Sequence, residues 1–409
     1  METSDERPNI VLVGYAVPKD DLDEVTKHDA YPQIQGTKLM WRIICGVEEC
    51  GSLAMDLIGS VPASDYPRNP RFVFGFRRWA HKSGASDVVM PFVNVIFLKH
   101  LTRLLSTFAL LCKWLVKNRK AKNRHILIYA MHSPYVLAAA LAKLLFQTKT
   151  TVVVLDLPAF MNAGLKVSVI RRIAKIVDAL IMGVAMRSMD GLIVLTEHAG
   201  RAIGPAATPK LVVEGAVSLD EVPSLPRLKD VRERKKVVMF TGALVGLDIL
   251  LNAFKLIEDP DTYLYLSGRG PMEQEIIEAA RCDRRIAYFG FLSSEALLER
   301  MSEATVFVNV RSAKTPFIEY SFPSKLLEYM ATGRPTISTR LPSIPDEYHE
   351  YLYLLREETP EHLARLIIEV CNKASVELDD FGCRARDFVR TQKNYLRQGE
   401  RIYQFIRSL

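Results

Sequence analysis

Apolar runs of strand length alternate with segments of helical period along most of the first half of the chain. The predicted strands cover residues 10–13, 53–58, 88–93, 125–131, 151–157, 191–195 and 210–217. The predicted helices cover residues 35–50, 96–118, 135–146 and 167–189. This alternation is typical of a parallel sheet wrapped by helices.

The same alternation starts again after a polar segment, residues 218–229, that contains two prolines. The second set of predicted strands covers 237–241, 262–266, 285–289, 305–310 and 336–338. The helices between them cover 248–257, 272–280, 295–303 and 324–331. We therefore predict an α/β protein with two Rossmann-like doubly wound domains that face a cleft.

The predicted domain boundaries follow from these patterns. The first Rossmann-like domain covers 1–217, and the second covers 218–384. Residues 385–409 are predicted to form a C-terminal helix that packs back toward the first domain. A length of 409 residues fits this division, because single hydrophobic cores stop growing below that size.

Composition excludes several classes of protein. The polar, acidic N-terminus lacks a secretory signal, and no window reaches about 18 uninterrupted apolar residues, so we expect a cytoplasmic protein without a membrane span. The six Cys form no Cys-x-x-Cys pair, which favours reduced thiols over structural metal. No Gly-x-Gly-x-x-Gly or phosphate-binding P-loop is present, so a nicotinamide enzyme or P-loop NTPase is not predicted.

The most informative segment is 317–338. Pro323 and Ser324 are typical of a helix start, and Gly333 followed by Pro335 is typical of its end. A helix N-terminus favours a bound anion such as a diphosphate. Lys325 and Glu328 lie one turn apart, so the first could neutralise phosphates and the second accept ribose hydroxyls. An ordinary surface ion pair explains the same spacing, and both interpretations stay open.

This segment resembles the donor-site motif of glycosyltransferase family 4, whose members have the GT-B fold and retain anomeric configuration. The matching positions are Pro323, Ser324, Lys325, Glu328, Ala331, Gly333, Pro335 and Ile337. In the second half, 267–271 resembles the family's turn beside the nucleotide, and 289–292 resembles the turn that commonly meets the base. In the first half, 46–51, 129–134 and 156–161 resemble bacterial exopolysaccharide and capsule-assembly members of the family.

The resemblance implies a role for individual residues. The implied catalytic residues are His132, which would contact the transferred sugar, together with Lys325 and Arg269. The implied donor-binding residues are Glu328, Ser324, Gly268, Gly270, Phe291, Arg311, Ser321 and Gly14. The resemblance also implies that the domain over 1–217 binds the acceptor and that the domain over 218–384 binds the nucleotide sugar. The donor would be a nucleotide-diphosphate sugar, and neither a cofactor nor a metal is implied. A histidine at a strand end is otherwise a capping or packing residue.

Two departures from the family pattern affect this interpretation. Family 4 enzymes usually carry two glutamates eight positions apart, but position 320 is Tyr here, and the nearest acid is Glu319. The family also tends to place Arg and Lys after the first strand of the second domain, where this chain reads Phe-Thr-Gly-Ala-Leu over 240–244. The diphosphate charge is therefore expected to fall to Arg269, Arg311, Lys314 or Lys325.

The formal charge of +7 lies in the first half, where residues 1–225 hold 27 Lys or Arg and 20 Asp or Glu. Residues 72–82 mix aromatics with cations, and the helix from Ile96 carries cations around an apolar stripe. These cations are Lys99, Arg103, Lys113, Lys117, Arg119 and Lys120. The pattern suits an anionic membrane surface, although the stripe could instead pack on the sheet and leave the cations merely solvated.

We therefore expect a retaining glycosyltransferase of cell-surface polysaccharide assembly, located in the cytoplasm on the inner face of the membrane. Its acceptor would be a glycan or a lipid-linked sugar. No nucleic-acid-binding motif accompanies the charge. A GT-B nucleotide-sugar epimerase and a non-catalytic membrane-associated scaffold subunit remain as alternatives.

Overall fold

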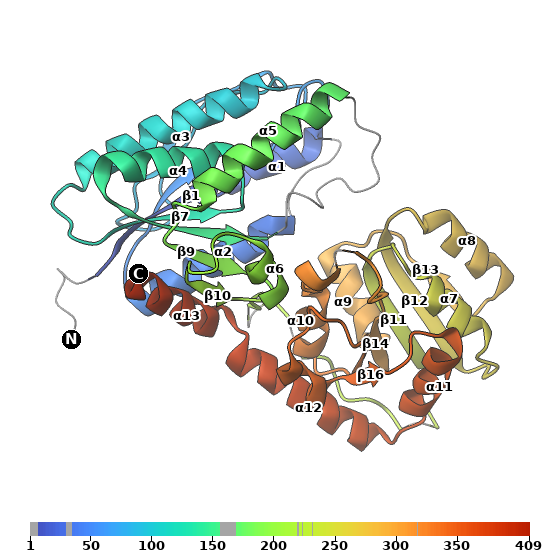
Figure 1. Cartoon of the computed structure of the whole chain (residues 1–409). Coiled ribbons are helices and arrows are strands. Elements are labelled where there is room, and N and C mark those ends of the chain that lie inside the picture. The colour runs from blue at the N-terminus through green and yellow to red at the C-terminus, as the bar shows by residue number, and fades with distance from the viewer. Residues whose placement is uncertain are drawn as a thin grey trace. The chain divides into compact units, whose positions relative to one another are not determined.

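The computed structural model describes residues 7–29, 35–155, 169–218, 221–222, 224–230, 232–316 and 318–409. The chain divides into two compact units (Figure 1). The first contains Met1–Ala216 and Tyr395–Leu409, and the second contains Val217–Asn394. The first unit is therefore built from both ends of the chain.

The first unit holds an eight-stranded sheet with the order β10-β9-β8-β7-β1-β2-β5-β4. Its strands are β1 (Asn9–Gly14), β2 (Asp56–Gly59), β4 (Arg77–Trp79), β5 (Asp87–Val89), β7 (Arg124–Tyr129), β8 (Lys149–Val154), β9 (Gly191–Val194) and β10 (Lys210–Val212). All neighbours are parallel except β4 and β5. A separate antiparallel pair consists of β3 (Val73–Phe74) and β6 (Phe92–Val93).

Helices cover both faces of this sheet (Figure 1). On one face α2 (Gln35–Gly51) packs against α13 (Tyr395–Ser408), and both contribute to a core with Ile10, Leu12 and Leu127. The opposite face carries α3 (Leu98–Lys117), α4 (Ser133–Phe146) and α5 (Val169–Met186), with α4 packed between the other two. Two short helices, α1 (Lys19–His28) and α6 (Glu197–Ala202), complete the unit.

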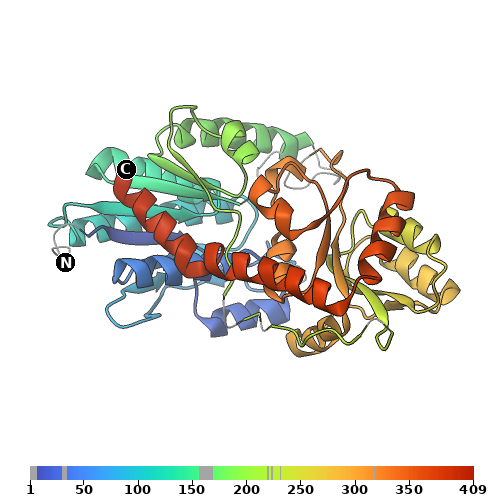
Figure 2. The ribbon, with the colours of Figure 1, turned by 90° about the horizontal axis from the view of Figure 1, so that it is seen from below.

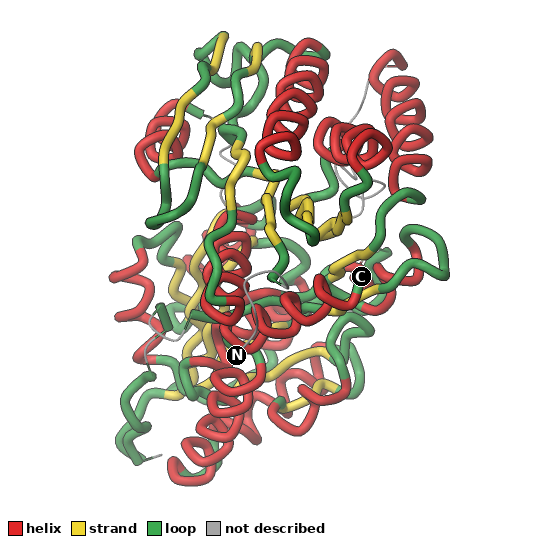
Figure 3. Tube along the Cα trace, turned by 90° about the vertical axis from the view of Figure 1, so that its left-hand side faces the viewer, coloured by secondary structure: helices red, strands yellow, loops and turns green. Residues whose placement is uncertain are grey.

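The second unit holds a parallel six-stranded sheet with the order β13-β12-β11-β14-β15-β16. Its strands, yellow in Figure 3, are β11 (Lys236–Ala243), β12 (Thr262–Arg269), β13 (Ile286–Tyr288), β14 (Val306–Asn309), β15 (Thr336–Thr339) and β16 (Tyr353–Leu355). Its helices are α7 (Asp248–Lys255), α8 (Glu273–Cys282), α9 (Ser294–Glu303), α10 (Ser324–Ala331), α11 (Pro360–Cys371) and α12 (Ser375–Gln392). Two short 3₁₀ segments, Ile318–Tyr320 and Asp346–Tyr351, lie in its loops.

The predicted alternation of strands and helices is confirmed in both units, and α10 has the predicted bounds. Sequence reasoning missed α1, β16 and α11. The return of the chain was predicted at residue 385, whereas α12 stays with the second unit and the first unit resumes at Tyr395. Because the tail has a helical pattern throughout, its sequence did not reveal the break at Lys393 and Asn394 that separates α12 from α13.

The view of α3 as a helix with solvated cations is wrong for its first half. Lys99 and Arg103 are 6% and 3% exposed and point into the unit. The Lys99 ammonium donates to the carbonyl of Ala63 at 2.6 Å and pairs with Asp65 at 2.9 Å, while Arg103 donates to the carbonyl of Val61 at 2.8 Å. Carbonyls in the loop after β2 accept hydrogen bonds from both cations. Helical periodicity does not reveal such contacts.

Helix α13 is the dark red helix that ends at the C-terminus in Figure 2. It joins the first unit through a pair of glycines, Gly46 on α2 and Gly399 on α13. A Cβ atom added at Gly46 would overlap the carbonyl oxygen of Tyr395, and one added at Gly399 would overlap the backbone of Gly46. The two helices therefore approach through backbone atoms, which only glycine permits at this crossing.

We predict that Gly46→Ala lowers the free energy of unfolding by roughly 1–3 kcal/mol, since overpacking forces the two helices apart. Gly183→Ala on α5 is the matched control, because a Cβ there meets nothing within 4 Å. The free energy of unfolding of the control should rise by about 0.5–1 kcal/mol, because Ala has a higher helix propensity than Gly. Urea unfolding followed by circular dichroism measures both, and equal stability of the two variants would contradict the close helix crossing.

A buried charge cluster ties β4 and β5 to α2. The His81 ring hydrogen-bonds Asp87 through Nδ1 at 2.8 Å and Glu48 through Nε2 at 3.0 Å. Burial alone would lower the pKa of His81, but the hydrogen bonds to Asp87 and Glu48 outweigh it and raise the pKa to about 9. His81 is thus a partly buried cation between two buried carboxylates.

This cluster predicts a loss of stability at alkaline pH. The folded-state pKa of His81, about 9, lies above the usual value of 6.5, so the stabilisation is complete below 6.5 and disappears as pH rises through 9. The whole effect is on the order of 3 kcal/mol. His81→Gln should be less stable than the parent at neutral pH and should lose less on alkalinisation. Melting curves between about pH 6 and 10 measure this, and parallel curves would contradict the charged state of His81.

Candidate functional site

In open parallel sheets, ligands bind at the carboxyl ends of strands where the strand order reverses. In the first unit this switch point lies between β1 and β7, because β1 pairs with β2 on one side and β7 on the other. Gly14 ends β1 there, and a Cβ on it would lie 3.0 Å from the Cβ of Tyr129. The residues that follow these strands, Tyr15 and His132, reach the same edge.

His132 stands at the start of α4, where its carbonyl accepts from the amides of Tyr135 and Val136. Its ring packs edge-on against Tyr135, with centroids 4.9 Å apart, and against His100 at 5.4 Å. The preceding Ala130 has φ of 71°, a left-handed conformation that non-glycine residues seldom adopt. The backbone of His132 therefore caps α4 and its ring lies at the switch point, while its contact with a sugar stays a prediction.

The protonation state of His132 is set by its surroundings. Burial, reinforced by the charges of Arg103, His100 and Lys99, holds the pKa of His132 well below its usual value of 6.5. The Arg103 guanidinium lies 3.5 Å from Nε2, which favours the tautomer that carries the proton on Nδ1. His132 is thus a neutral imidazole at this edge.

Sequence reasoning missed Arg103, Tyr15 and Tyr135 as neighbours of His132. Arg103 stacks on Phe92 at 4.3 Å and lies 5.8 Å from the Tyr15 ring, and among the described residues no carboxylate pairs with it. Burial raises the pKa of Tyr15, so its hydroxyl stays protonated. Arg103 is 29 positions away from His132 and gave no local signal.

In the second unit the switch point lies between β11 and β14. Helix α10 begins beside the end of β11, since a Cβ on Gly242 would lie 3.9 Å from the Lys325 side chain. Pro323 precedes the helix without a side-chain cap, and the first turn contains no acidic residue. The first amides of α10 and Lys325 therefore form a positive region at the ligand-binding edge of this sheet.

Tyr329 fixes α10 in this place, and sequence reasoning missed it. Its buried hydroxyl donates to the carbonyl of Thr241 at 2.8 Å and accepts from the Thr241 amide at 2.9 Å. Its ring stacks on Phe307 of β14 with centroids 4.6 Å apart. One side chain thus joins α10 to both strands of the switch point.

Lys325 and Glu328 form an ion pair at 2.6 Å in which both side chains are about one-third exposed. The surface ion pair that their spacing allows is therefore present in the structure. Arg311 follows β14, and burial lowers the pKa of its guanidinium. Within the described residues no carboxylate pairs with Arg311, so its charge is free to meet an anion.

Arg269 and Phe291 lie together at the ends of β12 and β13. The guanidinium of Arg269 lies 5.2 Å from the centre of the Phe291 ring, which is 72% exposed. Packing requires glycine at positions 268 and 270, because Cβ atoms on Gly268 and Gly270 would overlap the backbone of Gly242 and Leu244. The turn after β12 is therefore packed directly on the turn after β11.

The carboxyl edge of the second sheet thus gathers most residues predicted for the donor. Gly268 and Arg269 end β12, and Gly270, Phe291 and Arg311 follow β12, β13 and β14. Ser321 and Ser324 are at least partly exposed just before and at the start of α10. His132 and Gly14 belong to the first unit, at its own switch point. The 156–161 segment, with its acid at 156, lies outside the described residues.

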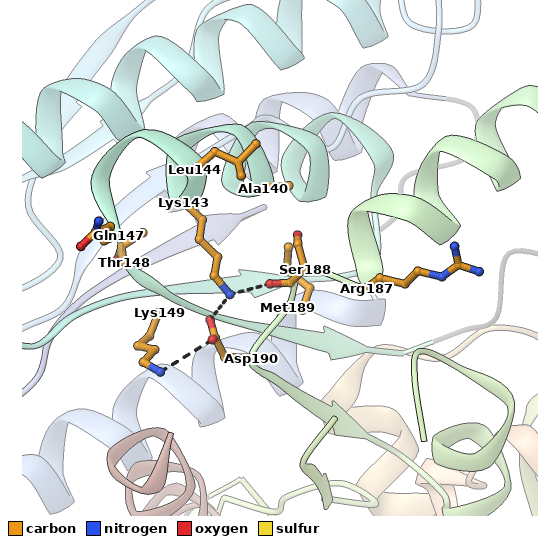
Figure 4. Close-up of a pocket in the computed structure, with 10 residues that line it drawn as sticks. All are labelled: Ala140, Lys143, Leu144, Gln147, Thr148, Lys149, Arg187, Ser188, Met189 and Asp190. Carbon is orange, nitrogen blue, oxygen red and sulfur yellow. Dashed lines mark hydrogen bonds and ion pairs between the residues drawn. The ribbon is translucent and has the colours of Figure 1, made fainter. Parts of the chain in front are cut away.

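A hollow of about 750 Å³ lies at the opposite edge of the first sheet (Figure 4). Its lining comes from the ends of α4 and α5 and the residues that precede β8 and β9, so it is remote from the carboxyl edge that holds His132. In the described parts of the chain, no group of three or more His, Cys, Asp or Glu side chains is arranged to hold a metal ion. None of the described helices has the length and apolarity to cross a membrane.

Residues 235–373 match the protein family described as Glycosyl transferases group 1. This range contains β11 to β16 and therefore every candidate donor residue of the second unit. No curated protein matches the sequence as a relative.

Several solved structures share the fold of the whole chain. Sucrose-phosphate synthase from Thermosynechococcus elongatus has a TM-score of 0.65 at 14% identity, with 98% of this chain and 99% of that chain covered. Anabaena HepE in complex with UDP has a TM-score of 0.61 at 13% identity, covering 98% and 100%. The lipopolysaccharide outer core galactosyltransferase WaaB has a TM-score of 0.59 at 15% identity, with 97% of this chain and 99% of that chain covered.

These likenesses confirm the predicted fold class, with two Rossmann-like domains in the GT-B arrangement of secondary structure. Together, the family match over 235–373 and the GT-B fold support a glycosyltransferase.

Proposed function

We propose that this protein is a retaining glycosyltransferase that moves a sugar from a nucleotide diphosphate to a glycan or lipid-linked acceptor in the assembly of a cell-surface polysaccharide. The observation that carries the proposal is the position of α10, whose uncapped N-terminus and Lys325 lie beside Gly242 at the switch point. The family match covers this helix and both strands of the switch point.

On this proposal the second unit holds the donor. The first amides of α10, Lys325 and Arg311 would bind the diphosphate, where positive groups stabilise the charge that develops on the departing phosphate. Glu328 would accept hydrogen bonds from the ribose hydroxyls. Phe291, stacked under Arg269 and open to solvent, would lie against the base. HepE binds UDP and UDP-glucose, so uridine nucleotides are the first donors to test.

Donor binding would then reorganise the Lys325–Glu328 ion pair. In the structure each charge satisfies the other at 2.6 Å. A diphosphate at the start of α10 would attract Lys325 toward the helix N-terminus, and a ribose would compete for Glu328. A partly exposed pair is worth little by itself, so separating it costs little compared with the new contacts.

The transfer step would occur on one face of the sugar. The bond between the anomeric carbon and the diphosphate oxygen breaks, a bond to the acceptor oxygen forms, and the acceptor proton passes to the departing phosphate. His132 would position the sugar as a neutral hydrogen-bonding group. In this scheme positioning and positive charge supply the catalysis, and no step is assigned to a metal or a cofactor.

The first prediction tests the donor site. Glu328→Gln should weaken binding of the matching nucleotide sugar about tenfold or more, because an amide replaces a charged acceptor. Glu303→Gln is the control, since Arg300 and Glu303 form an i,i+3 pair of the same 2.6 Å length and similar exposure on α9. A thermal-shift screen with UDP, GDP and ADP identifies the nucleotide, and calorimetry measures affinity. Equal affinity in both variants would remove Glu328 from the site.

The second prediction tests the stereochemistry. With an α-linked donor, proton NMR of the product should show an α-linkage, because same-face transfer retains the configuration. His132→Ala should slow the reaction and leave some activity, since positioning is lost but the leaving-group contacts remain. A β-linked product would exclude retention, and donor conversion without any acceptor would favour an epimerase instead.

A further inference from the structure

The helices that cover one face of the first sheet are apolar on their outer side. The large apolar residues exposed on α3, α4 and α5 are Leu98, Leu101, Leu105, Val116, Leu141, Leu144, Leu145, Ile176, Val177, Leu180, Ile181 and Val184. Leu144 and Leu180 are 77% and 67% exposed. Because α4 packs against both α3 and α5, these side chains lie on one layer of adjacent helices (Figure 1). Apolar patches of this kind mark interaction surfaces.

The orientation of α3 makes this exposure significant. The helix buries Lys99 and Arg103 and leaves Leu98, Leu101 and Leu105 at least half exposed. Burying cations is costly unless they are well bonded, and here loop carbonyls and Asp65 bond them. The second half of α3 turns Leu111 and Leu115 inward, as an amphipathic helix normally does, so the outward leucines of the first half favour an apolar partner.

The charge around this face is one-sided. Between Asp87 and Asp156 the chain has no acidic residue and ten Lys or Arg. The last turn of α3 and the loop after it expose Lys117, Arg119 and Lys120, and Lys113 is exposed one turn earlier. Asp178 is the single acidic residue in the sequences of α3, α4 and α5. An anionic partner is therefore favoured.

The hollow of Figure 4 continues this cationic border. Leu144 lines it together with Lys143, Lys149 and Arg187. Its one acid, Asp190, is bonded by the Lys143 ammonium at 2.7 Å and by the amide of Thr150 at 2.9 Å. Lys149 lies 3.8 Å from Asp190. The lining of the hollow therefore has three cations and a single carboxylate, which the Lys143 ammonium already bonds.

We propose that the outer side of α3, α4 and α5, hereafter the apolar helix face, docks in the surface of an anionic lipid bilayer. The aliphatic side chains would enter the boundary of the acyl chains, and the bordering Lys and Arg would meet lipid phosphates. The exposed large apolar residues within these helices are all Leu, Ile or Val. Protein–protein hot spots favour Trp, Tyr and Arg instead, which makes lipid the better match.

This inference goes beyond the transfer reaction and does not depend on it. Glycosyl transfer concerns the carboxyl edges of the sheets, whereas the apolar helix face consists of surface side chains of three helices. A protein that binds vesicles but transfers no sugar would leave this proposal intact, and failure to bind vesicles would leave the transfer proposal intact.

The test uses the full chain and vesicles of phosphatidylcholine with about one-third phosphatidylglycerol. The apolar variant carries Leu101→Gln, Leu144→Gln and Leu180→Gln, one change on each helix. The control variant carries Val245→Gln, Leu256→Gln and Val376→Gln, which are comparably exposed residues of the second unit. Parent and control should co-sediment with vesicles, and the apolar variant should bind at least tenfold more weakly. Unchanged melting curves would show that all three proteins are folded.

A charge variant separates the two contributions. Replacing Lys113, Lys117, Arg119 and Lys120 by Gln should reduce the preference for anionic over neutral vesicles while leaving the residual apolar binding. Equal vesicle binding by parent and apolar variant would overturn the proposal. Absence of vesicle binding by the parent would also overturn it, and a parent dimer that the apolar variant converts to monomer would assign the face to a second copy.

Discussion

The candidate donor site depends on how β11 ends. Strands β11 and β14 pair at Val238 and Met239 and then separate, which leaves the backbone of Thr241 without a strand partner on that side. The hydroxyl of Tyr329 replaces the missing strand, because it bonds both the amide and the carbonyl of Thr241. This contact opens the switch point and at the same time holds the start of α10 beside it.

Sequence patterns predicted the bounds of α10 correctly, but they did not predict that Tyr329 anchors this helix to β11. Pro323, Gly333 and Pro335 are local signals, so the bounds of α10 follow from nearest neighbours in the chain. Tyr329 looks like one more apolar residue of the helix, and its partner Thr241 is 88 positions away. Long-range contacts of this kind are invisible to periodicity, which is also why Arg103 was not predicted beside His132. The fold class followed from alternation, whereas the roles of the predicted site residues remain predictions.

The same limit explains the misjudged orientation of α3. Its sequence has cations and leucines at helical spacing, and a helical wheel fixes only their relative faces. Which face turns inward depends on the groups of the sheet and its loops that the helix contacts. Here the carbonyls of Val61 and Ala63, in the loop after β2, are available as hydrogen-bond acceptors. Those acceptors would be unsatisfied beside leucines, so the cations of the first half of α3 turn inward and Leu98, Leu101 and Leu105 remain exposed, whereas Leu111 and Leu115 in the second half are buried.

The departure from the family pattern after β11 has a packing reason. The family tends to place Arg and Lys in this turn, but Leu244 and Leu247 are fully buried in the core of the second unit. The backbone of Leu244 is also covered by Gly270, so the turn has no room for a long side chain in the same place. On the proposed function, the positive charge for the diphosphate would therefore come from the next elements around the switch point. Arg311 after β14 and Lys325 at the start of α10 are in that position, and both border the end of β11 from the side that Tyr329 holds open.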